Sequence, residues 1–157
     1  MSAEPRRVEV TLQTKVECVD LGEEVARQVA GAAGFDEDER YKISMAVREC
    51  LINALEHGNR GDARKPINLS FTLHSDRLVV AVGDQGSGFD LGAVPDPRTD
   101  EHLLKCSGRG LFLVRCFVDQ VQVACERNRG ATVTLTKWYS SNHKEPAGLK
   151  ADEEKQR

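Results

Sequence analysis

The segment from Met45 to Gly58, which reads MAVRECLINALEHG, sets the pattern around which the rest of the chain is arranged. Its apolar side chains recur at intervals of three and four residues, which places them on one face of an α-helix. Glu49 and Asn53 are four residues apart, so they lie one turn apart on the opposite side. Gly58 follows the last periodic residue, and we expect it to end the helix in a left-handed conformation. The apolar positions are Ile43, Val47, Cys50, Leu51, Ala54 and Leu55.

The polar side of this helix offers two kinds of chemistry. The side-chain oxygen of Asn53 is a hard ligand suited to Mg²⁺. The carboxylate of Glu49 can accept a proton from a nucleophile held beside it. On the helix alone, a solvated polar face is the commoner explanation of such a pair. The choice between these explanations therefore depends on the motifs further along the chain.

The composition predicts a soluble globular domain. Of the 157 residues, 39% are hydrophobic and 30% are charged, and the net charge is −3. The sequence has no cluster of basic residues beyond Arg6 and Arg7, so nucleic acid is not expected as a partner. No apolar run approaches the roughly 20 residues that a membrane span requires, and the first ten residues lack the apolar core of a secretory signal. Five scattered cysteines favour reduced thiols, so we expect a cytoplasmic protein.

Two helices are expected between the first strand and a polar turn at residues 59–66. Asp20 can cap the first helix, which is closed by Gly34. Asp36 can cap the second, with Glu39 three residues on as in a capping box, and this helix continues to Gly58. The apolar positions of the first helix are Leu21, Val25, Val29 and Ala32.

The strands are expected mostly in hairpins. We therefore predict an α+β fold, a two-layer α/β sandwich in which a mixed, mostly antiparallel sheet has its helices on one face. Residues 1–139 form the expected domain, and residues 140–157, which are almost without apolar side chains, form a disordered tail. The expected strands are 8–12, 67–73, 78–82, 121–125 and 133–138, and a third helix begins near residues 107–110.

A second motif, Asp84-x-Gly86-x-Gly88, follows the strand at 78–82. A carboxylate there can accept a hydrogen bond from an exocyclic amine, and the glycines let the backbone approach a flat ring closely. Taken alone, the motif is also what a tight turn with an aspartate cap would show.

A third motif, Gly108-Arg109-Gly110, opens the third helix. The free N–H groups and the dipole of a helix start form an anion site, to which Arg109 adds charge. An ordinary junction between loop and helix would look the same. The long segment 91–107 before it has the length of a lid or binding loop.

Together these motifs supply a metal ligand, a base, an amine acceptor and a phosphate cradle, which an adenine nucleotide with Mg²⁺ requires. Their order resembles the N, G1 and G2 boxes of the GHKL ATPases, which have a Bergerat-type ATP-binding fold. Within that superfamily the chain is most similar to the anti-sigma-factor serine kinases, from about Val8 to Lys137. The matching motifs are Glu49-x₃-Asn53-x₂-Glu56-His57-Gly58, Asp84-x-Gly86-x-Gly88-Phe89 and Ser107-Gly108-Arg109-Gly110-Leu111.

The resemblance implies a role for each motif. Glu49 would be the base for a serine hydroxyl, Asn53 would coordinate Mg²⁺, and Asp84 would bind the adenine amine of ATP. The remaining expected contacts are Gly86 and Gly88 around the adenine, Gly108, Arg109 and Gly110 at the phosphates, and Thr132 at the adenine. The implied partners are an anti-anti-sigma protein, which is the substrate, and a sigma factor, and the implied assembly is a homodimer.

Two positions depart from the family pattern. The last strand often begins Gly-Thr in this family, but here Gly130 is followed by Ala131, and Thr132 comes one residue later. The residue before Ser107 is an arginine in some members and is Cys106 here. These departures leave open a non-catalytic module that binds ATP and a partner. A third alternative, the ATPase half of a sensor histidine kinase, would need a phosphoacceptor hairpin for which the residues before Val8 leave no room.

Overall fold

The computed structural model describes residues 3–86, 110–126 and 129–140. Within these ranges five strands form one sheet, with the spatial order β1-β2-β3-β5-β4. Every pairing between neighbouring strands of this sheet is antiparallel. The elements are β1 (Arg6–Leu12), α1 (Val16–Ala32), α2 (Glu37–Asn53), η1 (Ala54–Gly58), β2 (Ile67–Leu73), β3 (Arg77–Gly83), α4 (Gly110–Phe117), β4 (Gln120–Glu126) and β5 (Gly130–Trp138).

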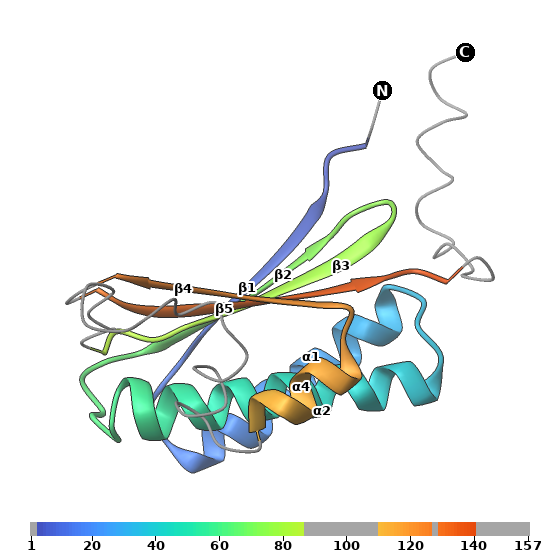
Figure 1. Ribbon diagram of the computed structural model, residues 1–157. Helices are drawn as coiled ribbons and strands as arrows, with labels where there is room; N and C mark the ends of the chain where they lie inside the picture. Colours follow the sequence, from blue (N-terminus) through green and yellow to red (C-terminus); the bar gives the residue numbers. More distant parts are fainter. Residues whose placement is uncertain (1–2, 87–109, 127–128, 141–157) are drawn as a thin grey trace.

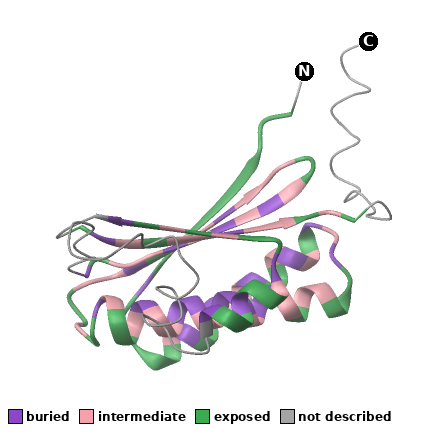
Figure 2. Cartoon of the chain, viewed as in Figure 1, coloured by how far each residue is buried: buried purple, intermediate pink, exposed green. Residues whose placement is uncertain are grey.

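Helices α1, α2 and α4 all lie on one face of the sheet, as Figure 1 shows. Alternation along the strands explains why only one face is covered, since successive side chains point to opposite sides. On β2 and β3 the pairs Leu69–Val82 and Phe71–Val80 are buried toward the helices. The predicted two-layer α+β fold is confirmed, and Figure 2 shows the buried segments gathered in the middle of the helix layer.

The first helix differs from its prediction in both its start and its buried face. It begins at Val16, so Asp20 lies inside the helix rather than at its cap. Leu21 is 61% exposed, and the core-facing positions are small residues spaced three and four apart. They are Val19, Gly22, Ala26 and Ala30. The prediction was wrong for Leu21 and Ala32, which are exposed, whereas Val25 and Val29 are partly buried and pack against the core as expected. Small side chains at the centre of the face let α1 approach α2 and the sheet closely.

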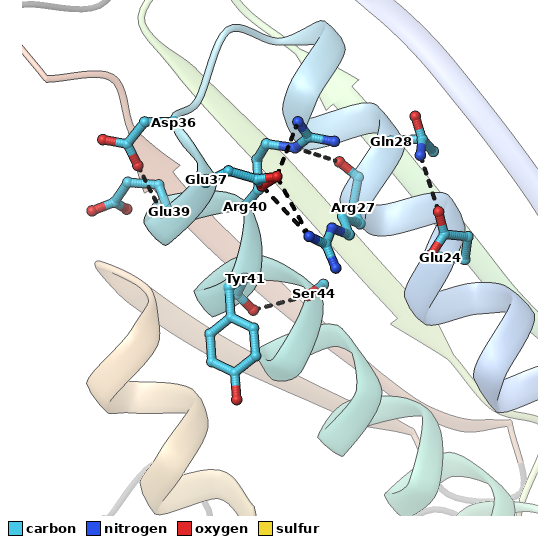
Figure 3. Close-up of polar contacts among 9 residues, drawn as sticks. All are labelled: Glu24, Arg27, Gln28, Asp36, Glu37, Glu39, Arg40, Tyr41 and Ser44. Carbon is cyan, nitrogen blue, oxygen red and sulfur yellow. Dashed lines mark hydrogen bonds and ion pairs between the residues drawn. The ribbon is translucent and has the colours of Figure 1, made fainter.

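Polar contacts hold the two long helices together. The side chain of Asp36 accepts a hydrogen bond from the Glu39 N–H at 2.8 Å, so the predicted cap of α2 is confirmed (Figure 3). Arg27 of α1 pairs with Glu37 of α2 at 3.5 Å, and Arg40 donates to the Arg27 carbonyl at 3.4 Å. These exposed contacts contribute little individually, at most about 1 kcal/mol each.

The end of α2 is a π-helical turn, η1, rather than a simple glycine stop. The Asn59 N–H donates to the Ala54 carbonyl at 2.7 Å across this wider turn. Gly58 is not left-handed, so that prediction was wrong; the positive φ angles come later, at Arg60 (51°) and Gly61 (69°). The π turn adds a residue before the chain reverses, and such turns occur frequently at functional sites.

Candidate functional site

Glu49 and Asn53 lie in the last turns of α2, as predicted, and both are half-buried. Within the part of the chain that the structure describes, neither side chain makes a hydrogen bond or ion pair. Both groups are exposed enough to bond to water. A carboxylate and an amide held one turn apart, without protein partners among the described residues, suit binding of an external group.

Cys50 marks the buried side of the same helix. Burial raises the pKa of the Cys50 thiol to about 12, and the charge of the neighbouring Glu49 adds a smaller increase. The thiol is therefore neutral at physiological pH and acts as a small apolar group in the core.

Asp84 follows β3 directly and continues its pairing with β5. Its N–H donates to the Ala131 carbonyl at 2.9 Å. The carboxylate atom Oδ1 accepts hydrogen bonds from the N–H groups of Gly86 (2.9 Å) and Ala131 (3.2 Å). Within residues 3–86, 110–126 and 129–140, Oδ2 accepts none. The carboxylate is thus held by one oxygen, which leaves the other free to accept a hydrogen bond from a bound molecule.

Three glycines surround Asp84 at distances that exclude any side chain. A Cβ on Gly58 would overlap the Asp84 carboxylate, and a Cβ on Gly86 would overlap the Gly58 carbonyl. A Cβ on Gly130 would overlap the Asp84 carbonyl, and φ at Gly130 is 86°. The end of the Glu49/Asn53 helix, the turn after β3 and the start of β5 therefore meet at this one carboxylate.

Alternation along β5 decides where Thr132 lies. Leu135 is buried on the helix side, and Thr132 pairs with Gly83 on the other side. The Thr132 side chain lies near Gly83 on the open face of the sheet, where a shallow hollow is lined by Thr132, Asn68 and Ser70 and also by Asp84 and Gln85. Ala131, not Thr132, makes the hydrogen bonds to Asp84, because it occupies the adjacent position on the helix side. The neighbouring Ala131 N–H instead bonds to Asp84 Oδ1, and the adenine contact of Thr132 stays a prediction.

The third motif lies mostly outside the described residues. Gly88, the lid segment 91–107, Cys106, Gly108 and Arg109 all fall in the range 87–109. Gly110 is described and begins α4, as predicted, and α4 packs against α2. Of the three residues expected to hold the phosphates, the structure therefore describes Gly110 alone. Residues 141–157 of the expected tail also lie outside the described residues, so that expectation stays a prediction.

Sequence reasoning missed Asn59, which it placed in a polar turn. Its side chain is 1% exposed, and Oδ1 accepts a hydrogen bond from the Gln85 N–H at 2.7 Å. Gln85 directly follows Asp84, so Asn59 contacts the backbone of the motif. Nothing in the spacing of the sequence distinguishes this residue from an exposed turn asparagine.

Two motifs that are distant in the sequence thus meet at Asp84. The family model for the histidine kinase-like ATPase domain matches residues 12–137. This chain belongs to that family. The GHKL resemblance indicated by the three motifs is thereby confirmed. The matched range runs from Leu12, the last residue of β1, to Lys137, near the end of β5.

Curated relatives of this histidine kinase-like ATPase domain are similar over nearly their whole length. Serine-protein kinase RsbW of Listeria monocytogenes serovar 1/2a is 28% identical over 145 residues, which cover 88% of this chain and 91% of the relative. Serine-protein kinase RsbW of Bacillus subtilis is 30% identical over 139 residues, which cover 85% of this chain and 86% of the relative.

Solved structures support the fold. A structure of the RsbU and RsbW domains from Mycobacterium tuberculosis matches 88% of this chain and 34% of its own, with a TM-score of 0.63 and 19% identity. The histidine kinase domain of a blue-light-activated histidine kinase from Erythrobacter litoralis matches 77% of this chain and 59% of its own, with a TM-score of 0.53 and 19% identity. Among the described residues, no helix has the length and apolar character needed to cross a membrane.

Proposed function

We propose that this protein is an ATP-dependent serine kinase that phosphorylates an anti-anti-sigma protein and also binds a sigma factor. One observation carries the proposal: the end of the Glu49/Asn53 helix packs directly on the Asp84 carboxylate at Gly58. This contact supports a site in which Glu49 would be the base, Asn53 the metal ligand and Asp84 the amine acceptor. The family membership and the serine-protein kinases among the relatives support the same function.

The adenine end of the proposed site is the turn after β3. Asp84 Oδ2 accepts a hydrogen bond from the exocyclic amine, while Oδ1 stays bonded to the N–H groups of Gly86 and Ala131. This fixed oxygen sets the orientation of the carboxylate before ATP binds, so little ordering is needed on binding. The resemblance implies that Gly86 and Gly88 would shape this end of the site around the adenine.

The phosphate end is formed by α2 and the start of α4. Asn53 would hold Mg²⁺ through its side-chain oxygen, a suitable hard ligand that has no partner among the described residues. Gly108, Arg109 and Gly110 would hold the phosphates at the N-terminus of α4, where backbone N–H groups and the helix dipole favour anions.

Glu49 performs the proton transfer in this proposal. Bound ATP supplies the γ-phosphoryl group. The Glu49 carboxylate accepts the proton of the partner's serine hydroxyl as the new bond from the serine oxygen to phosphorus forms and the bond to the ADP oxygen breaks. Most of the rate enhancement comes from positioning and from stabilising the charge of the transferring group.

The partners follow from the resemblance and from the relatives, and the proposed assembly is a homodimer in the cytoplasm. The test is incubation of the full chain with labelled ATP, Mg²⁺ and the anti-anti-sigma protein of the same organism. Label on a serine of that partner is the expected result. ATP binding without any transfer would instead identify a non-catalytic module that uses nucleotide to bind its partner.

A further inference from the structure

Both polar atoms of the buried Asn59 side chain are hydrogen-bonded. Its Nδ2 group lies 2.9 Å from Thr14 Oγ1, 2.9 Å from the Lys65 carbonyl and 3.1 Å from the Pro66 carbonyl. Its Oδ1 atom accepts from the Gln85 N–H at 2.7 Å. A buried amide with both ends bonded is held in one orientation, since any rotation would leave polar groups without partners.

The four groups bonded to Asn59 belong to segments that are distant in the sequence. Thr14 follows β1, Lys65 and Pro66 precede β2, and Gln85 follows Asp84 in the turn after β3. Thr14 adds to the network by donating to the Lys65 carbonyl. The Nδ2 side of Asn59 is therefore bound to the frame of the fold, and the Oδ1 side is bound to the turn that carries Asp84.

The π turn of η1 explains how Asn59 reaches this position. The Asn59 N–H bonds to the carbonyl of Ala54, five residues back, instead of four as in an α-helix. The extra residue in the turn rotates Asn59 inward, and it also brings Gly58 against the Asp84 carboxylate. The same local distortion thus positions both contacts to the turn at residues 84–86.

We propose that Asn59 is a positioning residue for recognition of the adenine base. Its hydrogen bond with the Gln85 N–H would fix the turn that carries Asp84. In that turn Oδ1 keeps its hydrogen bonds to the backbone, and Oδ2 would face the base. This inference rests on the proposed function, in which Asp84 reads the exocyclic amine. If Asn59 only stabilised the fold, replacing it would weaken the binding of all nucleotides by the same factor, because the fraction of folded protein is the same for each.

The experiment compares ADP with inosine diphosphate, which carries a carbonyl in place of the exocyclic amine, by calorimetric titration in Mg²⁺ buffer. The wild-type protein is expected to prefer ADP by on the order of 100-fold, because the carbonyl faces a carboxylate that it cannot bond. In Asn59→Ala we expect that preference to fall about tenfold, the change that loss of one aligned hydrogen bond gives.

Two further variants separate positioning from stability. Thr14→Val removes a bond on the frame side, so its melting temperature should fall while the preference for ADP is kept. Asn59→Asp keeps the oxygen that accepts from Gln85 but loses the donors, so it should be less stable and retain more of the preference than Asn59→Ala. If Asn59→Ala does not fold, Asn59→Ser, whose hydroxyl is too short to reach the Gln85 N–H, takes its place with the same expectation.

The outcomes are distinct. A wild-type protein that binds ADP and inosine diphosphate equally well would contradict the proposed role of Asp84 and, with it, this inference. A wild-type preference that Asn59→Ala or Asn59→Ser leaves unchanged would overturn the role of Asn59 alone. An equal loss of preference in Thr14→Val would also overturn it, since the effect would then follow stability.

Discussion

The backbone of Gly58 lies so close to the Asp84 carboxylate that a Cβ at residue 58 would occupy the same space as the carboxylate oxygen. This contact joins the end of the helix that carries Glu49 and Asn53 to the start of the proposed adenine site. The contact also explains why residue 58 is a glycine. Its φ angle is not positive, so the backbone conformation alone does not require one.

Gly58→Ala should therefore weaken ATP binding by about tenfold or more, because the carboxylate must move, and should lower the free energy of unfolding by about 1–3 kcal/mol. Calorimetric titration with ATP and urea denaturation measure the two effects. Gly61→Ala is the control, since φ is 69° there and nothing lies within 4 Å of its Cβ position. It should be destabilised by backbone strain yet bind ATP normally; equal binding losses in both variants would contradict the Gly58 role.

Glu49→Ala should abolish transfer of phosphate to the partner serine while ATP binding remains largely intact. Loss of a general base lowers the rate by at least about 100-fold, whereas Glu49 contacts neither adenine nor Mg²⁺ in the proposal. Labelled-phosphate incorporation and calorimetric ATP titration measure the two properties separately. Glu24→Gln, on the exposed side of α1, is the control and should transfer phosphate at the wild-type rate. Unchanged incorporation in Glu49→Ala would rule out Glu49 as the base.

Adding a side chain at Gly22 or at Gly31 of α1 should change the stability of the protein in opposite directions. A Cβ on Gly22 would lie 2.5 Å from Leu51 Cδ1, in a core where Leu51 is fully buried. Gly22→Val should therefore cost about 1–3 kcal/mol of unfolding free energy through overpacking.

At Gly31, a Cβ would lie 2.8 Å from the guanidinium carbon of Arg40, whose half-exposed side chain can move aside. Gly31→Ala should therefore stabilise the protein by about 0.5–1 kcal/mol through helix propensity. Urea denaturation of both variants measures the difference. Stabilisation by Gly22→Val would contradict the close packing of α1 on α2.

Cys50 should not react with a thiol reagent at pH 8 in the native protein. Its thiol is buried and its pKa is raised to about 12 by burial and by the Glu49 charge, so the reactive thiolate is absent near neutral pH. Cys50→Ala should therefore leave the number of thiols titrated in the native state unchanged. In denaturant, the same substitution should lower the number from five to four. A native count that drops by one in the variant would show that Cys50 is accessible.

Local patterns in the sequence determined the elements and the family. Periodic apolar residues predicted α2 and the strands, Asp36 predicted the cap of α2, and the three spaced motifs predicted the ATPase family. These features succeed because they depend on neighbours within a turn or a strand, and the side chains that form them are close in the sequence.

Tertiary packing alone decided how those pieces meet. The small buried face of α1 at Gly22, the π turn before Asn59 and the contact between Gly58 and Asp84 each depend on segments far apart in the chain. Thr132 shows the same limit, since a shift of one residue along β5 moves a side chain to the opposite face of the sheet. Close packing against a backbone can require a glycine, but the sequence does not show which distant residue occupies the space where its side chain would be.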